Sequence, residues 1–283
     1  MKPILVNLGC GSRFNPQWLN FDIHSSSPAV RACDLLRGVP LADASCDAVY
    51  NAALLEHLPR SLAERFLCEC NRILKPGGIL RIGVPDLEQI CRLYLEKLAE
   101  ASRGNQTADT EYDWILLELL DQLVRTRSGG LMLGSLKNHA VNPVFVQSRI
   151  GDEYRQLQAS LASPASRLTR LRQLPPHEAR HRIWQAIRQG PNKLRRAIAR
   201  LILSSRDREA LSEGIFRNSG EVHRWMYDRY SLPRLLVASG FREPMVRPFD
   251  QSGIANNWPE QGLDSDKHGR PLKPDLIFIE CIK

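Results

Sequence analysis

The sequence lacks the features of several special protein classes. A charged residue interrupts every apolar run within a few positions, so no segment is predicted to span a membrane. The seven cysteines are odd in number and irregularly spaced, which excludes a small disulfide scaffold and favours free thiols in a reducing cytoplasm. The N-terminus has one lysine and no signal-peptide pattern, so we expect no secretion signal. There is no internal repeat or low-complexity tract, and a hydrophobic content of 43% excludes a disordered chain.

Positive charge is concentrated in one internal segment. The 283-residue chain has a net charge of +8. Residues 125–208 contain 17 Lys and Arg against 4 Asp and Glu, a balance of +13, which leaves the remainder mildly acidic. The length allows one large domain carrying an insertion. A basic module therefore interrupts an acidic domain and favours an anionic partner.

The first 86 residues alternate strands with turns and one helix. Predicted strands lie at residues 4–8, 20–23, 30–33, 48–50 and 79–84. Between the last two, a helix begins at Pro59 and carries apolar residues at a 3.6-residue period through Leu74. We expect Pro76-Gly77-Gly78 to end this helix sharply. Strands alternating with helices predict a parallel sheet covered on both faces.

The rest of the chain combines helices with two further strands. Residues 87–98, 114–124 and the basic stretch 180–203 have helical patterns, and the second is apolar on most sides, so it could serve a dimer. A short helix at 232–239 is stopped by Gly240. Extended segments at 243–249 and 275–282 follow, joined by a polar loop without a helical pattern. These two strands must pair antiparallel or lie apart in the sheet.

A glycine turn and two acids indicate a nucleoside site. Gly9 and Gly11 follow the first strand and allow a ligand to approach the backbone, whose exposed N–H groups suit a carboxylate or phosphate. Asp22 ends the second strand and can accept both ribose hydroxyls, and Asp34 ends the third near an adenine edge. A plain turn between strand and helix would explain the glycines equally well. A nicotinamide site prefers a third glycine, but Phe14 stands there.

The whole pattern resembles a known family. The signals, in order, are Val6-Asn7-Leu8-Gly9-Cys10-Gly11-Ser12, Asp22, Asp34, Ser45-Cys46-Asp47-Ala48-Val49-Tyr50, Leu55-Glu56-His57-Leu58 and Arg72-Ile73-Leu74-Lys75-Pro76-Gly77-Gly78. Over residues 4–86 this resembles a class I S-adenosylmethionine-dependent methyltransferase, and the segments from about 230 fit the same fold. The resemblance implies an α/β, Rossmann-like sheet of seven strands with the last antiparallel. Its core would be 1–86 and 230–283, with 87–229 as a mainly helical insertion after the fifth strand.

The resemblance also implies S-adenosylmethionine as cofactor. The residues implied to bind it are Gly9, Cys10, Gly11, Asp22, Ile23, Asp34, Leu35 and Asn51. The glycine turn would pass under the methionine part, Asp22 would hold the ribose, and Asp34 and Leu35 would lie near adenine. Asn51 would start the loop behind the sulfonium. The chain departs from the family in two places. The stretch from Gly11 to Asp22 leaves room for a helix of only about a turn, and Cys46 stands where an aromatic residue is usual.

Methyl transfer requires a positioned acceptor, exclusion of water and, for a hydroxyl, removal of a proton. The candidate catalytic residues are His57, Asp86 and His223, with His139, Tyr227 and Asp228 as further groups in reach. A packing role for His57 remains open.

No metal site is predicted from the sequence. His177-Glu178-Ala179-Arg180-His181 has the His-Glu-x-x-His spacing of zinc proteases. Pro175-Pro176 would fray the start of that helix, and the cation of Arg180 would oppose Zn²⁺.

The predicted activity is methyl transfer to a small-molecule or saccharide hydroxyl. The stretch from Tyr227 to Leu232, Tyr-Asp-Arg-Tyr-Ser-Leu, resembles bacterial methyltransferases associated with saccharide and cell-surface polymer biosynthesis. The basic segment could meet a phosphorylated, nucleotide-linked or lipid-linked sugar, lie on an anionic membrane face through 180–203, or pack as a solvated helix. A homodimer and a cytoplasmic or cytoplasmic-membrane location are expected.

Two alternatives to this activity stay open. One is a non-catalytic basic protein that binds a membrane or polymer. The other is a nucleic-acid methyltransferase. It is disfavoured because Asn51-Ala52-Ala53-Leu54 is not the Asn-Pro-Pro-aromatic sequence that holds a flipped base.

Overall fold

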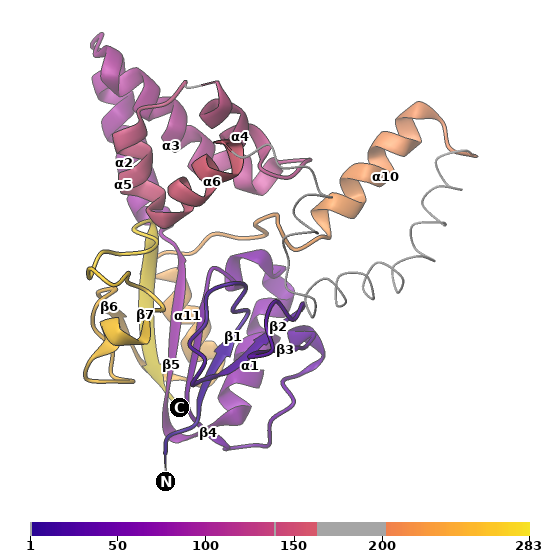
Figure 1. Ribbon diagram of the computed structural model, residues 1–283, viewed down its shortest axis with the longest axis vertical. Helices are drawn as coiled ribbons and strands as arrows, with labels where there is room; N and C mark the ends of the chain where they lie inside the picture. The colour runs from indigo at the N-terminus through magenta and orange to yellow at the C-terminus, as the bar shows by residue number, and fades with distance from the viewer. Residues whose placement is uncertain (1, 139, 163–201) are drawn as a thin grey trace.

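The computed structural model describes residues 2–138, 140–162 and 202–283 (Figure 1). His139, the His-Glu-x-x-His sequence and nearly all of the basic stretch 180–203 lie outside the described residues. A single mixed sheet organises the chain, with its strands in the order β3-β2-β1-β4-β5-β7-β6. The strands are β1 (Leu5–Leu8), β2 (Leu19–Asp22), β3 (Val30–Ala32), β4 (Cys46–Ala52), β5 (Leu74–Pro85), β6 (Arg242–Arg247) and β7 (Leu276–Ile282).

The direction of the strands confirms the predicted fold class. The first five strands are parallel, and β7 runs antiparallel to both of its neighbours, β5 and β6. This is the Rossmann-like sheet that the family resemblance implies, with its seventh strand inserted between the fifth and sixth. Because parallel strands end at the same edge, the residues after β1, β2 and β4 gather at one carboxyl edge of the sheet.

Two local predictions were wrong. Helix α1 (Arg60–Ile73) ends before Pro76-Gly77-Gly78, and β5 has already begun at Leu74. A register shift between Cys46 and Ala48 of β4 absorbs the extra residues, and the Gly77 N–H donates to the carbonyl of Lys283 at 3.2 Å. The proline and glycines therefore lie in a bulged strand, where a proline without an N–H is tolerated. The expected one-turn helix between Gly11 and Asp22 is a set of turns instead.

One face of the sheet is covered by helices and the other by a loop. Helices α1 and α11 (Ser231–Ala238) pack on the first face, and their apolar residues join the strands in the largest buried cluster. The second face is covered by residues 248–275, which include the short helix η3 (Trp258–Gln261). Here Trp258 packs against Tyr50 and Trp18, with ring centroids 5.8 and 6.0 Å away. Aromatic packing thus replaces a second helical layer over this part of the sheet.

A fully buried arginine holds this loop in place. Arg81 of β5 is 0% exposed, and its guanidinium bonds Asp264 and Glu280, each at 2.9 Å. It also donates to the carbonyls of Pro248 and Gln251. Five donors in a fixed fork suit such a convergence of carboxylates and carbonyls. Arg81 therefore connects the sheet to the start of the loop and, through Asp264, to its middle.

A helical layer stands over the carboxyl edge of the sheet (Figure 1). Its helices are α2 (Leu87–Ala101), α3 (Gln106–Val124), α4 (Gly130–Lys137), α5 (Pro143–Ile150) and α6 (Asp152–Ala162). They enclose their own apolar cluster around Trp114 and Val146. Within it, the buried Arg149 guanidinium pairs with Glu118 at 2.7 Å, which joins α5 to α3. The layer is positioned to cover whatever binds at the sheet edge below.

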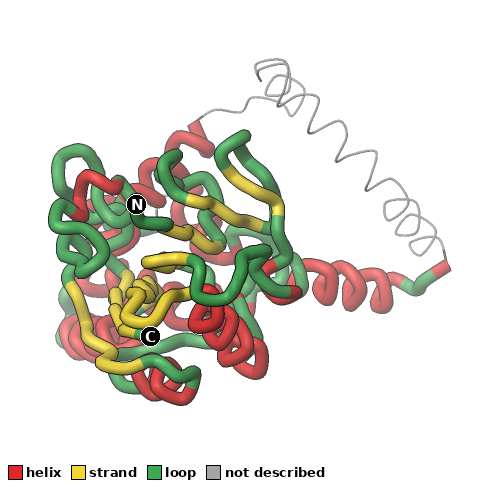
Figure 2. Tube along the Cα trace, turned by 90° about the horizontal axis from the view of Figure 1, so that it is seen from below, coloured by secondary structure: helices red, strands yellow, loops and turns green. Residues whose placement is uncertain are grey.

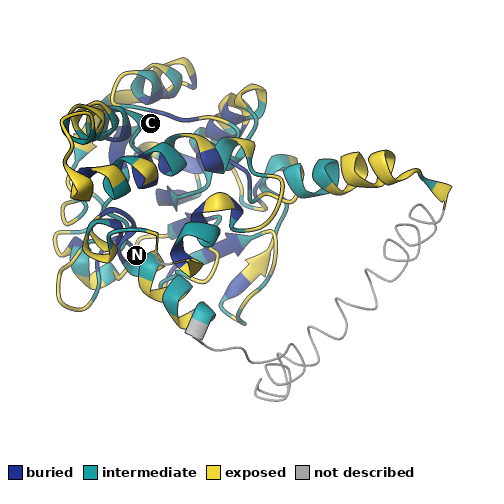
Figure 3. Ribbon diagram, turned by 90° about the horizontal axis from the view of Figure 1, so that it is seen from above, coloured by how far each residue is buried: buried dark blue, intermediate teal, exposed yellow. Residues whose placement is uncertain are grey.

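Helix α10 (Ser205–Arg217) differs from these helices because it projects away from the rest of the molecule (Figure 2). None of its residues is buried, and its outer half is exposed in Figure 3. Within the described part of the chain, no helix has both the length and the apolar character needed to cross a membrane.

Candidate functional site

The glycine turn after β1 adopts backbone angles that favour glycine, but it lacks the predicted free amides. Gly9 and Gly11 adopt φ values of +70° and +54°, which side chains disfavour. The N–H groups of Gly9 and Cys10 both donate to the carbonyl of Phe21, at 2.8 and 3.2 Å. The Gly11 N–H donates to Asp22 Oδ2 at 2.8 Å. These amides are therefore occupied by β2 and cannot hold an anion, which corrects the sequence expectation.

A cavity of about 460 Å³ opens over this turn. Its floor includes Gly9, Cys10 and Gly11, and Ala52 and Ala53 continue it along the end of β4. The walls come from distant parts of the chain: α6 contributes Glu153 and Gln156, and the C-terminal loop contributes Leu263, Asp264 and Lys273. This size and this mixed lining are typical of small-molecule sites.

Backbone geometry explains why the turn needs glycine. A Cβ on Gly9 would stand 2.8 Å from the side chain of Leu54, so any larger residue would push the chain after β4 away. A Cβ on Gly11 would meet nothing within 4 Å, so this glycine leaves open space. Neither residue has a side chain above the turn, so a ligand can contact the backbone directly.

Asp22 bonds to the turn, but neither it nor Ile23, Asp34, Leu35 or Asn51 is among the residues that line the cavity. The second oxygen of Asp22 accepts from the His24 N–H at 3.2 Å, and the carboxylate stays partly exposed with lone pairs to spare. Ile23 is 57% exposed beside it. Asp34 accepts from the Leu36 N–H at 3.2 Å and so caps a 3-10 turn, η1 (Leu35–Arg37), beyond β3.

Asn51 lies on the opposite face of the sheet from the cavity. Tyr50 and Ala52 line the cavity, and side chains alternate along a strand, so Asn51 faces the helix side. It is 0% exposed, and neither atom of its amide has a hydrogen-bond partner among the described residues. Its predicted role beside the sulfonium, like those of Asp34 and Leu35, stays a prediction.

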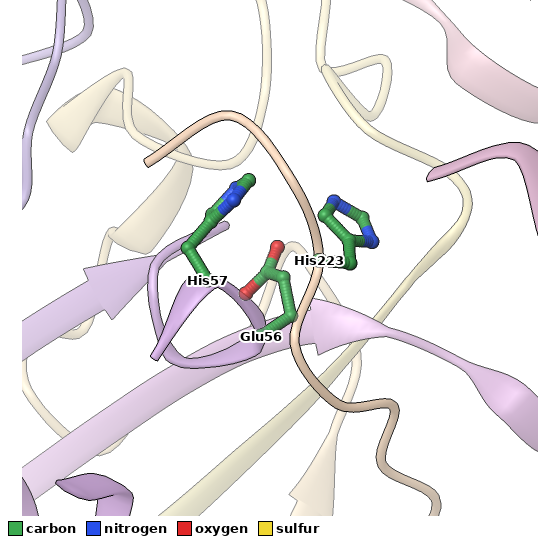
Figure 4. A group of neighbouring side chains, drawn as sticks. All are labelled: Glu56, His57 and His223. Carbon is green, nitrogen blue, oxygen red and sulfur yellow. The ribbon is translucent and has the colours of Figure 1, made fainter. Parts of the chain in front are cut away.

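Two of the predicted catalytic residues come together. His57 follows β4 in the short helix η2 (Leu55–His57), and His223 lies 166 positions later on the segment before α11. Their ring centroids are 4.7 Å apart at an angle of 84°. Glu56, which precedes His57, is 1% exposed and directs its carboxylate between the two rings (Figure 4). Backbone hydrogen bonds hold the segments of Glu56 and His223 together, because the N–H groups of Arg224 and Trp225 donate to the Glu56 carbonyl.

Burial controls the charge of this group. Burial raises the pKa of Glu56 to about 7, although the cation of Lys273 opposes the shift. Burial and then the nearby Lys273 lower the pKa of His57 to about 4. Burial, together with His57 itself, lowers the pKa of His223 to about 2. Both imidazoles are therefore neutral near pH 7 and present lone pairs rather than a positive charge.

The third predicted catalytic residue is separate from this group. Asp86 accepts from the Glu88 N–H at 3.0 Å and caps helix α2. It lines a second cavity of about 610 Å³, which shares Lys273, Leu276 and Phe278 with the first. Asp228 likewise caps a helix, because it accepts from the Ser231 N–H at 2.7 Å. The hydroxyl of Tyr227 is buried without a partner among the described residues, and burial beside Glu56 raises its pKa to about 12.

The sequence analysis did not select three residues that the structure places at the site. Glu56 was part of a quoted motif but received no role, although an acid next to a histidine after a strand was a usable signal. Glu153 and Lys273 line the cavity, and their charges act on Glu56. They come from an insertion helix and a C-terminal loop. No local motif marks either residue.

Comparison with known proteins agrees with this geometry. Residues 6–82 match the family model of a methyltransferase domain, which covers β1 to most of β5. Residues 6–82, which include the N-terminal strands and the glycine turn, are therefore similar to a methyltransferase domain. The cofactor of such domains is S-adenosylmethionine, and the residues present fit it. The glycine turn and the cavity above it have room for a methionine part, and the partly exposed Asp22, which is bonded to the turn but does not line the cavity, has acceptors for a ribose.

Two curated proteins match part of the chain. Ribosomal RNA-processing protein 8 of Rattus norvegicus is 38% identical over 86 residues, which is 28% of this chain and 18% of that protein. A protein of Mycolicibacterium smegmatis named "Probable S-adenosylmethionine-dependent methyltransferase" is 41% identical over 51 residues, which is 18% of this chain and 19% of that protein. The chain thus matches less than a fifth of the length of each relative.

Solved structures of similar topology include two bacterial proteins. A SAM-dependent methyltransferase from Thermotoga maritima aligns with 100% of this chain and 83% of its own, at 13% identity and a TM-score of 0.39. An S-adenosylmethionine-dependent methyltransferase from Mesorhizobium loti aligns with 99% of this chain and 91% of its own, at 12% identity and a TM-score of 0.38.

Proposed function

We propose that the whole protein is an S-adenosylmethionine-dependent methyltransferase that acts on a small-molecule acceptor. The proposal depends mainly on the cavity over Gly9–Gly11. This cavity lies at the carboxyl edge of the parallel strands within residues 6–82, which match the methyltransferase family model. When bound, S-adenosylmethionine supplies a methyl group on a positively charged sulfur, which is already reactive toward an electron pair. The protein's own tasks are therefore to bind, orient and exclude water.

Each task has a matching part of the structure. Asp22 accepts hydrogen bonds at the turn and is placed to accept more from a ribose. Helix α6 covers the turn from above, and the ion pair of Arg13 with Asp152, at 3.6 Å, holds it there. The C-terminal loop, fixed by Arg81, closes the remaining side. Enclosure of this kind keeps water from the reacting atoms.

For the acceptor, we propose a saccharide-type hydroxyl carrying a phosphate or another anionic group. The second cavity supports this, because Arg92, Arg229 and Arg247 contribute cationic side chains to its lining, and Lys273 links it to the first. All three arginines are paired with carboxylates: Arg92 and Arg229 with Glu88 at 2.6 and 2.7 Å, and Arg247 with Glu280 at 3.6 Å. An anionic group would therefore compete with these carboxylates for the guanidinium groups. A hydroxyl acceptor must lose a proton, and the neutral, buried group around His57 lies at the same edge. A cytoplasmic location and peripheral membrane contact remain part of this proposal.

A nucleic-acid acceptor is the second candidate. Its support is the match to ribosomal RNA-processing protein 8 and the net charge of +13 in residues 125–208. A non-catalytic binding protein on the same fold is the third candidate. The nucleic-acid candidate differs from the saccharide proposal in the substrate that becomes methylated. The non-catalytic candidate differs because no methyl group is transferred.

The test measures donor binding first and transfer second. Isothermal titration with S-adenosylmethionine is expected to give one site per chain. Isotope transfer is then measured with phosphorylated, nucleotide-linked and lipid-linked saccharides and with structured RNA. Labelling of a saccharide supports the acceptor proposal, whereas labelling of RNA alone replaces it. Failure of the folded protein to bind the donor would refute the methyltransferase proposal.

A further inference from the structure

Glu56, His57 and His223 share a geometry that none of the tasks above requires. One ligand atom from each lies within 4.8 Å of the other two, and the three side chains converge from two separate segments (Figure 4). Glu56 and His223 are buried, at 1% and 7% exposure. We propose that these three residues bind a divalent transition-metal ion at the carboxyl edge of the sheet, just after the end of β4 that lines the methyl-donor cavity.

The distances suit a common ion. Nitrogen and oxygen ligands stand about 2.1 Å from Zn²⁺, so neighbouring ligands of one tetrahedral ion lie about 3.4 Å apart. The ligand atoms lie within 4.8 Å of one another, so each pair must approach by at most about 1.4 Å to bind one ion. Rotations about side-chain bonds are sufficient for such a movement. The contact of Arg224 and Trp225 with the Glu56 carbonyl keeps the two segments together while this happens.

The unsatisfied atoms of the group point to a missing ligand. Among residues 2–138, 140–162 and 202–283, neither carboxylate oxygen of Glu56 has a hydrogen-bond partner, and Nδ1 of His57 has none. Buried polar atoms without partners are rare and costly in folded proteins. A packing cluster would satisfy these atoms or replace them with apolar groups. A metal ion satisfies all three at once.

The surrounding charges permit a cation. The charged neighbours of the group are Lys273, Arg125, Asp275, Glu153 and Glu221. Both cations are paired with carboxylates: the Lys273 ammonium lies 3.4 Å from Glu153, and the Arg125 guanidinium lies 3.4 Å from both Asp121 and Glu221. With Glu56 and Asp275 added, negative charge predominates around the site, which favours a divalent ion.

The donor set selects the type of ion. Two neutral imidazoles and one carboxylate bind Zn²⁺, Fe²⁺, Co²⁺ or Mn²⁺, whereas Ca²⁺ and Mg²⁺ prefer oxygen ligands throughout. Three protein ligands leave at least one coordination position free. An open position distinguishes a catalytic site from a closed structural one. The sequence analysis predicted no metal site, because the two histidines are far apart in the chain and the glutamate was not considered.

The position of the group suggests what the ion does, and this part rests on the proposed methyltransferase activity. The donor cavity includes Ala52 and Ala53 at the end of β4, and His57 follows them in η2, so both sites lie at the carboxyl edge of the sheet. An acceptor hydroxyl bound at the open position would become more acidic and release its proton to solvent. Its oxygen would then form the new O–CH₃ bond as the C–S bond breaks and the electron pair stays on sulfur. His57 and His223 would act as metal ligands rather than as bases.

The test is a metal titration of the full-length, tag-free protein after treatment with a chelator. Co²⁺ is the probe because its visible absorption reports nitrogen and oxygen coordination. The wild-type protein is expected to bind one equivalent, which Zn²⁺ displaces. His57→Ala, His223→Ala and Glu56→Gln are each expected to weaken Co²⁺ binding at least tenfold. The matched controls, exposed His268→Ala and exposed Glu64→Gln, are expected to bind as the wild type does.

Each alternative outcome overturns the proposal. Absence of bound Co²⁺ would do so, as would wild-type affinity in folded His57→Ala and His223→Ala variants. Loss of binding in His177→Ala instead would assign the metal to the His-Glu-x-x-His sequence. Glu56→Gln keeps the side-chain volume, and its circular dichroism and thermal unfolding show whether it is folded. Binding of the methyl donor is measured separately, with and without Co²⁺, and tests the methyltransferase proposal independently. Failure of the metal proposal is therefore distinguishable from failure of the methyltransferase proposal.

Discussion

Replacement of Asp22 separates its structural role from its proposed role in donor binding. In the structure, Oδ2 accepts from the Gly11 N–H at 2.8 Å and Oδ1 from the His24 N–H at 3.2 Å. Asp22→Ala removes both bonds from a partly exposed position, which should lower the free energy of unfolding by about 1–2 kcal/mol. If the carboxylate also holds the ribose, donor binding should weaken by about 1–3 kcal/mol, or about 5- to 150-fold.

A second variant tells these two effects apart. Asp22→Asn keeps the size of the side chain and one oxygen that can accept from the Gly11 N–H, so its stability should stay near that of the wild type. It loses the charge and the second acceptor that a pair of ribose hydroxyls needs, so donor affinity should still fall severalfold. Chemical denaturation measures the first quantity and isothermal titration the second. Asp113→Ala, an exposed acid on α3, serves as the control and should change neither.

The reasoning about Asp22 is refuted by one result. If folded Asp22→Ala and Asp22→Asn proteins bind the donor within twofold of the wild type, the carboxylate only fixes the glycine turn. The ribose must then lie elsewhere.

Three further predictions concern other parts of the molecule. Arg81→Met should lower the free energy of unfolding by about 3–5 kcal/mol in urea denaturation, because it leaves buried carboxylates without their cation; a loss under 1 kcal/mol would contradict this. Hydrogen bonds from Arg72 hold the pKa of Glu69 below its ordinary value of 4.5, so Glu69 contributes stability above that pH and loses it as the pH falls through the lowered pKa. Glu69→Gln should therefore destabilise the protein by about 1–2 kcal/mol at pH 7, with the difference shrinking below pH 4.5; an equal difference at low pH would show that no charge is involved. Burial raises the pKa of Cys10 to about 12, so iodoacetamide at pH 8 should label exposed Cys68 far faster, as peptide mass spectrometry would show; equal rates would contradict this protection.

The elements of the fold were largely predictable because their patterns are local. Period-two and 3.6-residue repeats report which face of a segment is buried, and they located all seven strands and helix α11 near their observed positions. The absence of a helical pattern between β6 and β7 left two arrangements open, and the family resemblance implied the antiparallel last strand that the structure has. The end of helix α1 was predicted to within one residue, but β5 begins at Leu74 and not at residue 79, because the register shift that places the proline and glycines in a strand depends on a partner strand.

The candidate site was only partly predictable because it is assembled from distant segments. The glycine turn and Asp22 are close in sequence, so the sequence could associate them, and the structure joins them through the Gly11 N–H. Their role in binding stays a prediction. His57 and His223 were each selected, but nothing in the sequence indicated that their rings meet. The occupied amides of the turn were also unpredictable, since they depend on the carbonyl of Phe21 in a neighbouring strand.

The insertion of β7 between β5 and β6 has a consequence for how the chain folds during synthesis. Strand β5 carries the open edge of the N-terminal methyltransferase domain, and its partner β7 is translated only after the whole helical layer. An open strand edge is a template for pairing with other chains. Until the ribosome has made the last strand, this edge stays exposed. A chaperone or the growing helical layer would have to shield the nascent protein from aggregation.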